Sequence, residues 1–520
     1  MSNIKVNTPL VLVILDGWGL WDEKKGNAIF QAKTPVMDDL YKNYPNIKIE
    51  ASSRFVGLPL DQPGNSEAGH MNIGAGRLVE QDAVIISKSI NNGTFFKNPA
   101  FLQAAGHADK HNSDIHLMGL LSDISSPHSD NDHLLSLISF FMAKTKQKIY
   151  IHLFTDGRDS PPYSALKILG QFNTIFNNPR VKIATIMGRF YAMDRKRAWD
   201  RTEKAYNALV LGQGQLADSP IEAVNQAYNR GESDEFIVPT VITKDGQPLA
   251  TIKDGDSVVF FNLRSDRARQ LTKAFVQKDF EKRKDGSFTR SKVLKDLSFV
   301  ALTDFGPDLE GVLTAYPGID LMDTLVMALG GLRQLYIAET EKFAHVTYFF
   351  NGGYDHIVVG EIRVEIPSKN VPSYDQLPEM STRETAHRVI KEIKERNFDF
   401  VTVNFASPDM VGHTGNLEAG IKAVEIVDKN LGLLIKEVLA KKGTVIVTAD
   451  HGNIEEMIDI KTNEINTEHS VNPVPFIIVS NKDRYKLKET GQLANIAPTI
   501  LDILGIPKPQ LMTSESLIIK

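Results

Sequence analysis

Side chains that commonly bind divalent metal ions are concentrated in the last quarter of the chain: Asp409, His413, Asp450, His451 and His469. Each group follows an apolar run or stands in the next loop. Carboxylate and imidazole ligands suit Mn²⁺, Zn²⁺ or Mg²⁺. The sequence contains no cysteine, which excludes disulfides, Fe–S clusters and thiolate zinc sites. The pattern predicts a metal site built from oxygen and nitrogen ligands.

Ser66 is the candidate nucleophile. It stands in Gly64-Asn65-Ser66-Glu67-Ala68-Gly69-His70, where small residues would present its hydroxyl at a tight turn running into a helix. The stretch is not a GxSxG elbow, because Ala68 stands two residues after the serine. A serine hydroxyl needs a base or a metal to react, and a Gly-Asn-Ser turn can also be only a turn. With Asp16, the candidate ligands become three aspartates, three histidines and one serine oxygen, enough to hold two ions that would activate the hydroxyl.

Five arginines lie at or after predicted strand ends in the middle of the chain: Arg158, Arg189, Arg195, Arg264 and Arg267. The planar guanidinium binds phosphate or carboxylate oxygens in pairs, so these arginines predict a pocket for a small polyanion. The alternative is that each forms an internal salt bridge with a neighbouring aspartate. Asp159 is accordingly a candidate general base or hydroxyl acceptor. The alternative is that it forms a salt bridge with Arg158 or Arg189. Lys342 could add a positive charge from the C-terminal segment.

Apolar runs alternate with helical patterns along the chain. The runs predict strands at residues 11–15, 115–121, 149–154, 181–187, 258–263, 400–405 and 445–447. Helical periodicity predicts helices at about 132–144, 164–176, 320–330, 383–395, 417–440 and 494–504. Such alternation predicts an α/β protein with doubly wound, mostly parallel sheets, whose functional residues gather at the carboxyl ends of strands. The charged, glycine-containing stretches 241–256 and 278–292 are typical of surface connections or a hairpin.

Composition narrows the function classes. The chain has 520 residues, 42% of them hydrophobic and 24% charged, so two or three domains are expected. The net charge of -5 gives no reason to expect nucleic acid or an anionic membrane as partner. The N-terminus has no signal-peptide pattern, and no apolar run approaches the roughly 18 residues of a membrane span. We expect a cytoplasmic protein with a local basic site.

Four motifs resemble those of the alkaline-phosphatase-like metalloenzymes and, more narrowly, those of the cofactor-independent phosphoglycerate mutases. They are Val13-Ile14-Leu15-Asp16-Gly17-Trp18-Gly19, Gly64-Asn65-Ser66-Glu67-Ala68-Gly69-His70, Pro408-Asp409-Met410-Val411-Gly412-His413-Thr414-Gly415 and Thr448-Ala449-Asp450-His451-Gly452-Asn453. The resemblance runs from about residue 8 to 512. It implies one metal on Asp409, His413 and His469, and the other on Asp16, Ser66, Asp450 and His451. It favours Mn²⁺ over Mg²⁺, Co²⁺ or Zn²⁺, and it implies no need for 2,3-bisphosphoglycerate.

The resemblance also implies a set of substrate-binding residues: His128, Arg158, Asp159, Arg189, Arg195, Arg264, Arg267 and Lys342. Two details depart from the family pattern. His128 follows Pro127 and is followed by Asp130, where a second histidine is usual, and Ser265 replaces the usual proline after Arg264. These changes alter the loops around His128 and Arg264 without removing the functional side chains.

The implied architecture is discontinuous. Residues 1–80 and 316–520 would form a phosphatase-like metal-binding domain, and residues 81–315 an inserted phosphotransferase domain that binds substrate. The implied activity is that of an isomerase of glycolysis and gluconeogenesis. It would interconvert 3-phosphoglycerate and 2-phosphoglycerate through a phosphoserine on Ser66, in a monomer whose two-domain cleft closes to exclude water.

Two alternatives remain at this point. A phosphatase, sulfatase or phosphopentomutase would share the metal ligands, although the arginine-bearing insertion around Gly188–Arg195 argues against it. A non-catalytic binding protein on the same scaffold would show no turnover. Metal analysis together with one kinetic assay separates the three.

Overall fold

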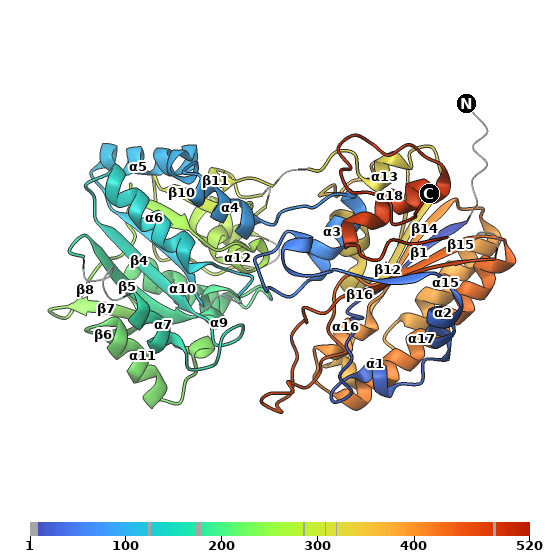
Figure 1. Ribbon diagram of the computed structural model, residues 1–520. Helices are drawn as coiled ribbons and strands as arrows, with labels where there is room; N and C mark the ends of the chain where they lie inside the picture. Colours follow the sequence, from blue (N-terminus) through green and yellow to red (C-terminus); the bar gives the residue numbers. More distant parts are fainter. Residues whose placement is uncertain are drawn as a thin grey trace. The chain divides into compact units, whose positions relative to one another are not determined.

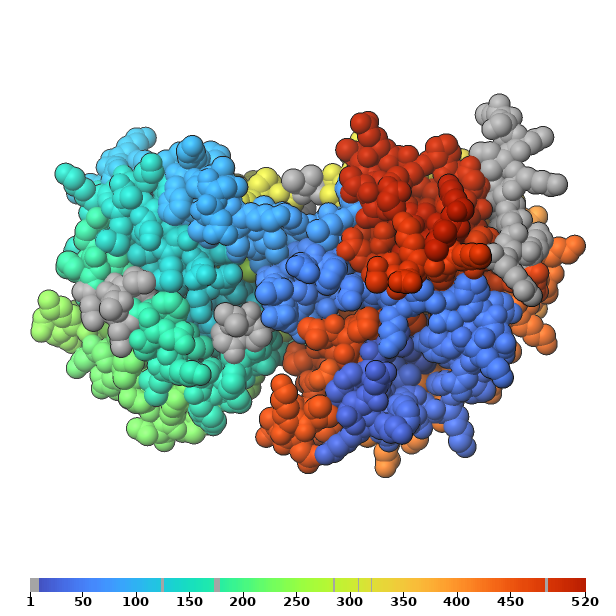
Figure 2. Space-filling view, in the orientation of Figure 1, coloured from blue at the N-terminus to red at the C-terminus, as the bar shows by residue number. Residues whose placement is uncertain are grey.

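The computed structural model describes residues 9–122, 126–172, 178–283, 286–306, 308–318, 320–481 and 485–520. The chain forms two compact units, one of Met1–Gln81 with Ile319–Lys520 (unit 1) and one of Asp82–Gly318 (unit 2) (Figure 1). Unit 1 thus contains both ends of the chain. In Figure 2 the blue N-terminal segment and the orange and red C-terminal segment lie together on its surface.

Unit 1 is built on a seven-stranded sheet. Its strands, in spatial order, are β13 (Ile362–Ile366), β12 (Gln334–Glu339), β14 (Phe400–Phe405), β1 (Leu10–Leu15), β15 (Thr444–Thr448), β16 (Val474–Ser480) and β2 (Asn46–Ile49). The first five are parallel, whereas β16 pairs antiparallel with β15 and β2. In β1, Ile14 lies opposite Asn404 and Thr448. The loops after β14, β1 and β15 therefore leave the sheet at one edge.

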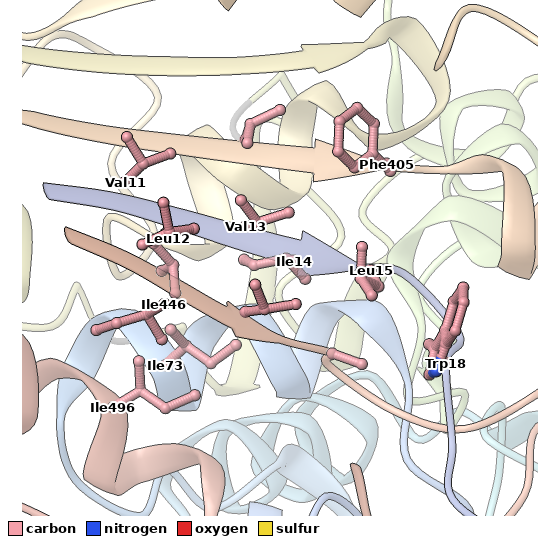
Figure 3. Close-up of a cluster of buried hydrophobic side chains, with 14 of the residues drawn as sticks. Val11, Leu12, Val13, Ile14, Leu15, Trp18, Ile73, Phe405, Ile446 and Ile496 are labelled. Atoms are coloured by element: carbon pink, nitrogen blue, oxygen red, sulfur yellow. The ribbon is translucent and has the colours of Figure 1, made fainter. Parts of the chain in front are cut away.

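Helices cover both faces of this sheet. They are α1 (Ala28–Gln31), α2 (Pro35–Asn43), α3 (Ser66–Ala75), α13 (Leu325–Ala328), α14 (Thr340–Ala344), α15 (Thr382–Glu395), α16 (Ser407–Gly412), α17 (Leu417–Ala440) and α18 (Ile496–Leu504). Figure 1 shows α2, α15 and α17 on one face and α3 and α18 on the other. All six residues of β1 are fully buried, and Ile73 and Ile496 pack beneath the strands (Figure 3). Two covered faces explain why β1 is apolar throughout rather than alternating.

Unit 2 has its own nine-stranded sheet. The strands run in the order β11 (Val312–Tyr316), β10 (Ser298–Thr303), β9 (Ser257–Phe260), β3 (Ile115–Leu121), β4 (Ile149–Thr155), β5 (Val181–Gly188), β7 (Thr240–Lys244) and β6 (Gln215–Ala217), with β8 (Gln247–Pro248) paired to β7. Only β7 breaks the parallel arrangement, by pairing antiparallel with β5 and β8.

The helices of unit 2 are α4 (Asp82–Asn91), α5 (Pro99–His111), α6 (Asn131–Lys144), α7 (Ala165–Gln171), α9 (Arg189–Ala192), α10 (Trp199–Leu211), α11 (Pro220–Asn229) and α12 (Ser265–Val276). They create two apolar cores, one on each face of the sheet. In β3, Ile115 and Leu117 belong to the core with Phe101, whereas Met118 and Leu120 belong to the core with Tyr206. The sheet is therefore doubly covered, like that of unit 1.

The predicted α/β class is confirmed, and each predicted strand is present. The run 258–263 is strand only to Phe260. Beyond it, the backbone N–H of Leu120 in β3 donates to the side-chain oxygen of Asn262 at 2.8 Å, in place of a backbone carbonyl of β9. The predicted hairpin in 241–256 is the β7–β8 pair. The helix predicted over 320–330 is wrong except for α13, because Asp323 (φ 59°) adopts a left-handed conformation just before α13 begins. Of the helix predicted over 164–176, residues 173–176 lie outside the described residues. No helix in the described part of the chain is long and apolar enough to cross a membrane.

Candidate active site

The predicted metal ligands all lie near the carboxyl ends of strands in unit 1. Asp16 directly follows β1, and Asp450 and His451 follow β15. Asp409 lies in α16, which begins two residues after β14, with His413 as its C-cap. His469 lies in the loop that leads into β16, and Lys342 lies in α14, directly after β12. Parallel pairing brings the loops after β12, β14, β1 and β15 to one edge of the sheet, where α/β proteins place their functional residues, and the antiparallel strand β16 begins at the same edge.

Ser66 is the first residue of α3, as the turn before it predicted. Asn65 is the N-cap, and its side chain accepts a hydrogen bond from the N–H of Ala68 at 2.8 Å. The Ser66 Oγ atom is 3.0 Å from Nε2 of His451 and 3.3 Å from Oδ1 of Asp16. Ser66 is only 3% exposed. A buried hydroxyl at a helix N-terminus lies where the partial positive charge of the helix stabilises an attached or approaching anion.

Three buried aspartates surround one lysine. The Lys342 ammonium lies 2.7 Å from Oδ1 of Asp16, 2.6 Å from Oδ2 of Asp409 and 2.7 Å from Oγ of Ser66. Burial lowers the pKa of Lys342, but Asp16, Asp409 and Asp450 raise it further, so the side chain stays charged. Oδ2 of Asp450 is buried without a hydrogen bond from any described residue. Three carboxylates with a single lysine leave negative charge that further cations would neutralise.

Backbone carbonyl groups orient the rings of His413 and His469, and both rings face the Asp409 carboxylate. Nδ1 of His413 and of His469 lie 2.7 Å and 2.8 Å from the carbonyl oxygens of Thr467 and Gly64. Their Nε2 atoms face Oδ1 of Asp409 at 3.4 Å and 3.2 Å. A hydrogen bond at one ring nitrogen leaves the other available, which is the usual state of a histidine that binds a metal.

Two triads satisfy the distance requirement of a metal site. One ligand atom each from Asp409, His451 and His469 lie within 4.8 Å of one another, as do those from Asp16, His70 and Asp450. Burial lowers the pKa of His451, yet the carboxylates of Asp450, Asp16 and Asp409 raise it to about 10. The buried carboxylates and imidazoles fit divalent cations, whose binding would displace the proton from His451.

Sequence reasoning missed three polar residues behind the ligands. Nδ1 of His70 lies 2.9 Å from the carbonyl oxygen of Ser66 and 3.2 Å from Oδ2 of Asp450. Asn404 donates to Oδ2 of Asp16 at 2.6 Å, and Asn453 donates to Oδ1 of Asp409 at 2.8 Å. An asparagine inside the apolar run Phe400–Phe405 was a visible signal, because a buried amide requires partners. His70 stands four residues after Ser66, one helical turn away.

The predicted arginine cluster lies in unit 2, at the carboxyl ends of β4, β5 and β9. Arg189, the first residue of α9, is 2% exposed. Its Nη1 atom lies 2.5 Å from Oδ1 of Asp156 and 2.6 Å from Oδ2 of Asp159. Asp159 is thus an arginine partner, as the salt-bridge alternative anticipated, and it also lies 3.8 Å from Nε2 of His128. Nε of Arg189 and Nδ1 of His128 have no hydrogen bond to any described residue.

The remaining arginines gather around His128 and Arg267. Asp266 pairs with Arg195 at 2.7 Å and with Arg264 at 3.2 Å. Burial and the charges of Arg195, Arg189 and Arg158 lower the pKa of Arg267 to about 10. The pKa of His128 is held well below its ordinary value by burial, Arg189 and Arg264. Positive charge therefore exceeds negative charge here, which suits a bound anion. Of the altered loop before His128, residues 123–125 lie outside the described residues.

The fold and the buried carboxylate–imidazole cluster are those of a metalloenzyme. A family model described as the metalloenzyme superfamily matches residues 8–508. A 2,3-bisphosphoglycerate-independent phosphoglycerate mutase of Moorella thermoacetica is 48% identical over 520 residues, covering 99% of each chain. One from Clostridioides difficile is 48% identical over 516 residues, covering 98% of this chain and 99% of its own. A crystal structure of Leishmania mexicana phosphoglycerate mutase at low cobalt concentration is 30% identical, with a TM-score of 0.81, and covers 100% of this chain and 99% of its own.

The chain therefore belongs to the metalloenzyme superfamily and, within it, to the family of 2,3-bisphosphoglycerate-independent phosphoglycerate mutases. The family predicted from the four motifs is confirmed, as is the prediction of a metal-dependent enzyme.

Proposed function

We propose that this enzyme interconverts 3-phosphoglycerate and 2-phosphoglycerate through a phosphoserine on Ser66, without added 2,3-bisphosphoglycerate. The observation that carries the proposal is the placement of the Ser66 hydroxyl, buried at the N-terminus of α3 within 3.3 Å of Asp16, His451 and Lys342. A serine that only capped a helix would not be surrounded by two ionised partners and an imidazole.

The proposed reaction has two phosphoryl transfers. In the first, the Ser66 oxygen loses its proton and bonds to phosphorus, while the bond from phosphorus to one glycerate oxygen breaks and that oxygen takes a proton. In the second, the other glycerate hydroxyl loses its proton and bonds to phosphorus, while the bond from phosphorus to the Ser66 oxygen breaks and that oxygen takes a proton. The Lys342 ammonium, 2.7 Å from Oγ, neutralises charge near the transferring group in both steps.

Glycerate has to stay bound between the two transfers and reorient, so that its other hydroxyl faces the phosphoserine. We propose that Arg158, Arg189, Arg195, Arg264 and Arg267, with His128, hold the anionic groups of the substrate. Asp159 accepts and returns the proton of the glycerate hydroxyl. The Nε atom of Arg189 supports this assignment, because it is a buried donor without a partner among the described residues and would gain most from a bound anion.

We propose that two divalent ions bind in unit 1, one to Asp409, His413 and His469 and the other to Asp16, Ser66, Asp450 and His451. When bound, such ions supply Lewis-acid activation of a hydroxyl and stabilise charge on a transferring phosphoryl group. The oxygen and imidazole donors favour Mn²⁺, with Mg²⁺, Co²⁺ and Zn²⁺ as alternatives. Residues 1–80 and 316–520 would then be the metal-binding domain and residues 81–315 the substrate-binding domain of a cytoplasmic monomer.

The test is conversion of 3-phosphoglycerate to 2-phosphoglycerate, coupled to enolase, with Mn²⁺ and without bisphosphoglycerate. We expect conversion that a chelator abolishes and Mn²⁺ restores. Hydrolysis of phosphate esters without mutase activity would keep the metal site but overturn the substrate. Absence of both activities in metal-loaded protein would overturn the proposed function.

A further inference from the structure

Glu455 is a fully buried carboxylate that no step of the proposed reaction uses. It lies in the loop after β15 and is 0% exposed. Oε2 accepts hydrogen bonds from the backbone N–H of Gly19 at 3.0 Å and of Asn453 at 2.9 Å. Oε1 accepts from the hydroxyl of Ser470 and from Nδ2 of Asn472 at 3.0 Å. All four partners are donors, so the carboxylate is satisfied by hydrogen bonds and has no position left for a cation.

These four donors come from three chain segments in two loops, the loop after β1 and the long loop between β15 and β16, and each segment carries a proposed metal ligand. Gly19 follows Asp16 by three residues, Asn453 follows His451 by two, and Ser470 directly follows His469. The two loops are distant in sequence, since Gly19 and Glu455 are 436 positions apart. A carboxylate that accepts hydrogen bonds from all three segments fixes the distances between them.

The segment that carries Asp409 is connected through Asn453. The backbone of Asn453 donates to Glu455, and its side chain donates to Oδ1 of Asp409 at 2.8 Å. Glu455 is therefore linked, directly or through Asn453, to every segment that carries a proposed metal ligand except that of Ser66.

Two glycines make room for this carboxylate. A Cβ atom on Gly19 would lie 2.1 Å from Oε1 of Glu455, and one on Gly452 would lie 2.3 Å from the same oxygen. Any other residue at either position would displace the carboxylate. The glycines of Asp16-Gly17-Trp18-Gly19 and Asp450-His451-Gly452 that contact Glu455 are thus explained by the space that its side chain occupies.

We propose that Glu455 is a positioning residue of the metal centre: it sets the spacing of the three segments that carry Asp16, His451 and His469, and thereby the affinity for divalent cations. This inference rests on the proposed metal site. It predicts that neutralising Glu455 weakens metal binding without removing any ligand, because residues that orient ligands typically change metal affinity by about 10- to 100-fold.

The experiment is a Mn²⁺ titration of the metal-stripped full-length protein, with free Mn²⁺ followed by electron paramagnetic resonance, for wild type and Glu455→Gln. Glutamine keeps the shape of the glutamate side chain. Its amide NH2 group would, however, face groups that are themselves hydrogen-bond donors, so some of the hydrogen bonds made by Glu455 would be lost. We expect the dissociation constant to rise by about 10- to 100-fold. Glu361→Gln is the matched control. Glu361 is a 2% exposed carboxylate in unit 1 that accepts from the backbone of Val358 and Val359 and from Arg363, none of them in a ligand loop.

The control separates positioning from general stability. Both variants should melt earlier than wild type without metal, but only Glu455→Gln should bind Mn²⁺ more weakly. Unchanged affinity in Glu455→Gln, or equal weakening in both variants, would overturn the inference. If Glu455→Gln does not fold, Ser470→Ala removes one donor and should weaken binding by several-fold; no change there would also overturn it. A wild type that binds neither Mn²⁺ nor Co²⁺ would instead overturn the proposed metal site, on which this inference rests.

Discussion

The two units place opposite charge at the carboxyl ends of their sheets. In unit 1, Asp16, Asp409 and Asp450 are at most 1% exposed and share the positive charge of Lys342. In unit 2, arginines outnumber the aspartates that hold them, and the pKa of Arg267 falls to about 10. The same fold class therefore concentrates negative charge in one unit and positive charge in the other. The comparison shows that the type of ligand follows from the residues at the strand ends, because parallel sheets only determine where the site lies.

Substitution of Ser66, the proposed nucleophile of unit 1, should have the largest effect on activity. Ser66→Ala should lower kcat by more than about 10⁴-fold, because the proposed route carries the phosphoryl group on Ser66 between the two transfers. Steady-state kinetics with the enolase-coupled assay measure it. Ser52→Ala is the control, since that buried hydroxyl donates only to the carbonyl of Val471 at 3.0 Å and should leave kcat nearly unchanged. A Ser66→Ala enzyme within tenfold of wild type would refute the phosphoserine route.

Protons should compete with metal in unit 1. Because the pKa of His451 is raised to about 10 in the metal-free site, this imidazole holds a proton at neutral pH, and metal binding has to release it. We therefore expect the Mn²⁺ dissociation constant to rise by about tenfold for each unit of acidification between pH 8 and pH 6, and activity at limiting Mn²⁺ to fall with it.

The concentration of Mn²⁺ provides the control for that prediction. Saturating Mn²⁺ should move the acidic limb of the activity profile to lower pH, because the metal then outcompetes the proton. A limb that stays in place, or a flat profile from pH 8 to pH 6 at limiting Mn²⁺, would contradict the prediction.

Arg267→Met should separate function from stability in unit 2. The lowered pKa of Arg267 means that its charged form is less favourable in the folded than in the unfolded protein, so loss of the charge should raise stability at pH 7 by up to about 1 kcal/mol. Loss of a charged hydrogen-bond donor to substrate should lower kcat/KM by about 10- to 100-fold. Thermal melts and steady-state kinetics measure the two effects.

Arg201→Met is the contrasting variant. Arg201 pairs with Asp194 at 3.2 Å and lies 3.8 Å from the ring centroid of Phe190, so its charge is compensated. We expect this substitution to lower the melting temperature slightly and to leave KM unchanged. An Arg267→Met protein that is destabilised as much as Arg201→Met would show that Arg267 is a structural ion-pair residue.

The last effect is on stability alone and concerns Glu339, three residues before Lys342. Burial raises the pKa of Glu339 from 4.5 to about 7 in the folded protein. Between these two pH values the folded state keeps the proton on this carboxyl group, whereas the unfolded state has already released it. Stability from this group is present below pH 4.5, is lost as pH rises to 7, and stays constant above. Glu339→Gln should therefore raise the free energy of unfolding at pH 8 by about 1–3 kcal/mol relative to its effect at pH 5.

Asp82 offers the same test in unit 2. Burial and Asp304 raise its pKa to about 6, so Asp82→Asn should produce a smaller difference over a lower pH window. Chemical denaturation at pH 5 and pH 8 measures both variants. Equal curves for wild type and Glu339→Gln at the two pH values would contradict the assignment.

The sequence predicted elements well where one physical signal dominated. The run at β1 and the amphipathic pattern of α17 were read correctly, because complete burial and a long helical period leave little choice. It missed β12 and β16, whose runs lie beside charged or proline-containing loops, and it extended α13 beyond the left-handed residue Asp323. Local pattern does not show where the backbone leaves the helical region, since that depends on the packing of Gly352 against Leu321 and Thr324.

The sequence alone determined the chemistry available to this protein: a serine in a helix-entry turn, oxygen and imidazole ligands without thiolates, and arginines at strand ends in an acidic chain. Only the tertiary structure decided which of these groups meet. It placed Lys342 against Ser66, paired Asp159 with Arg189, and brought Glu455 against Gly19 from a loop 436 residues away. The physical reason is that parallel strand order, rather than sequence distance, sets which strand ends are neighbours, and buried polar groups then take whichever partners that order supplies.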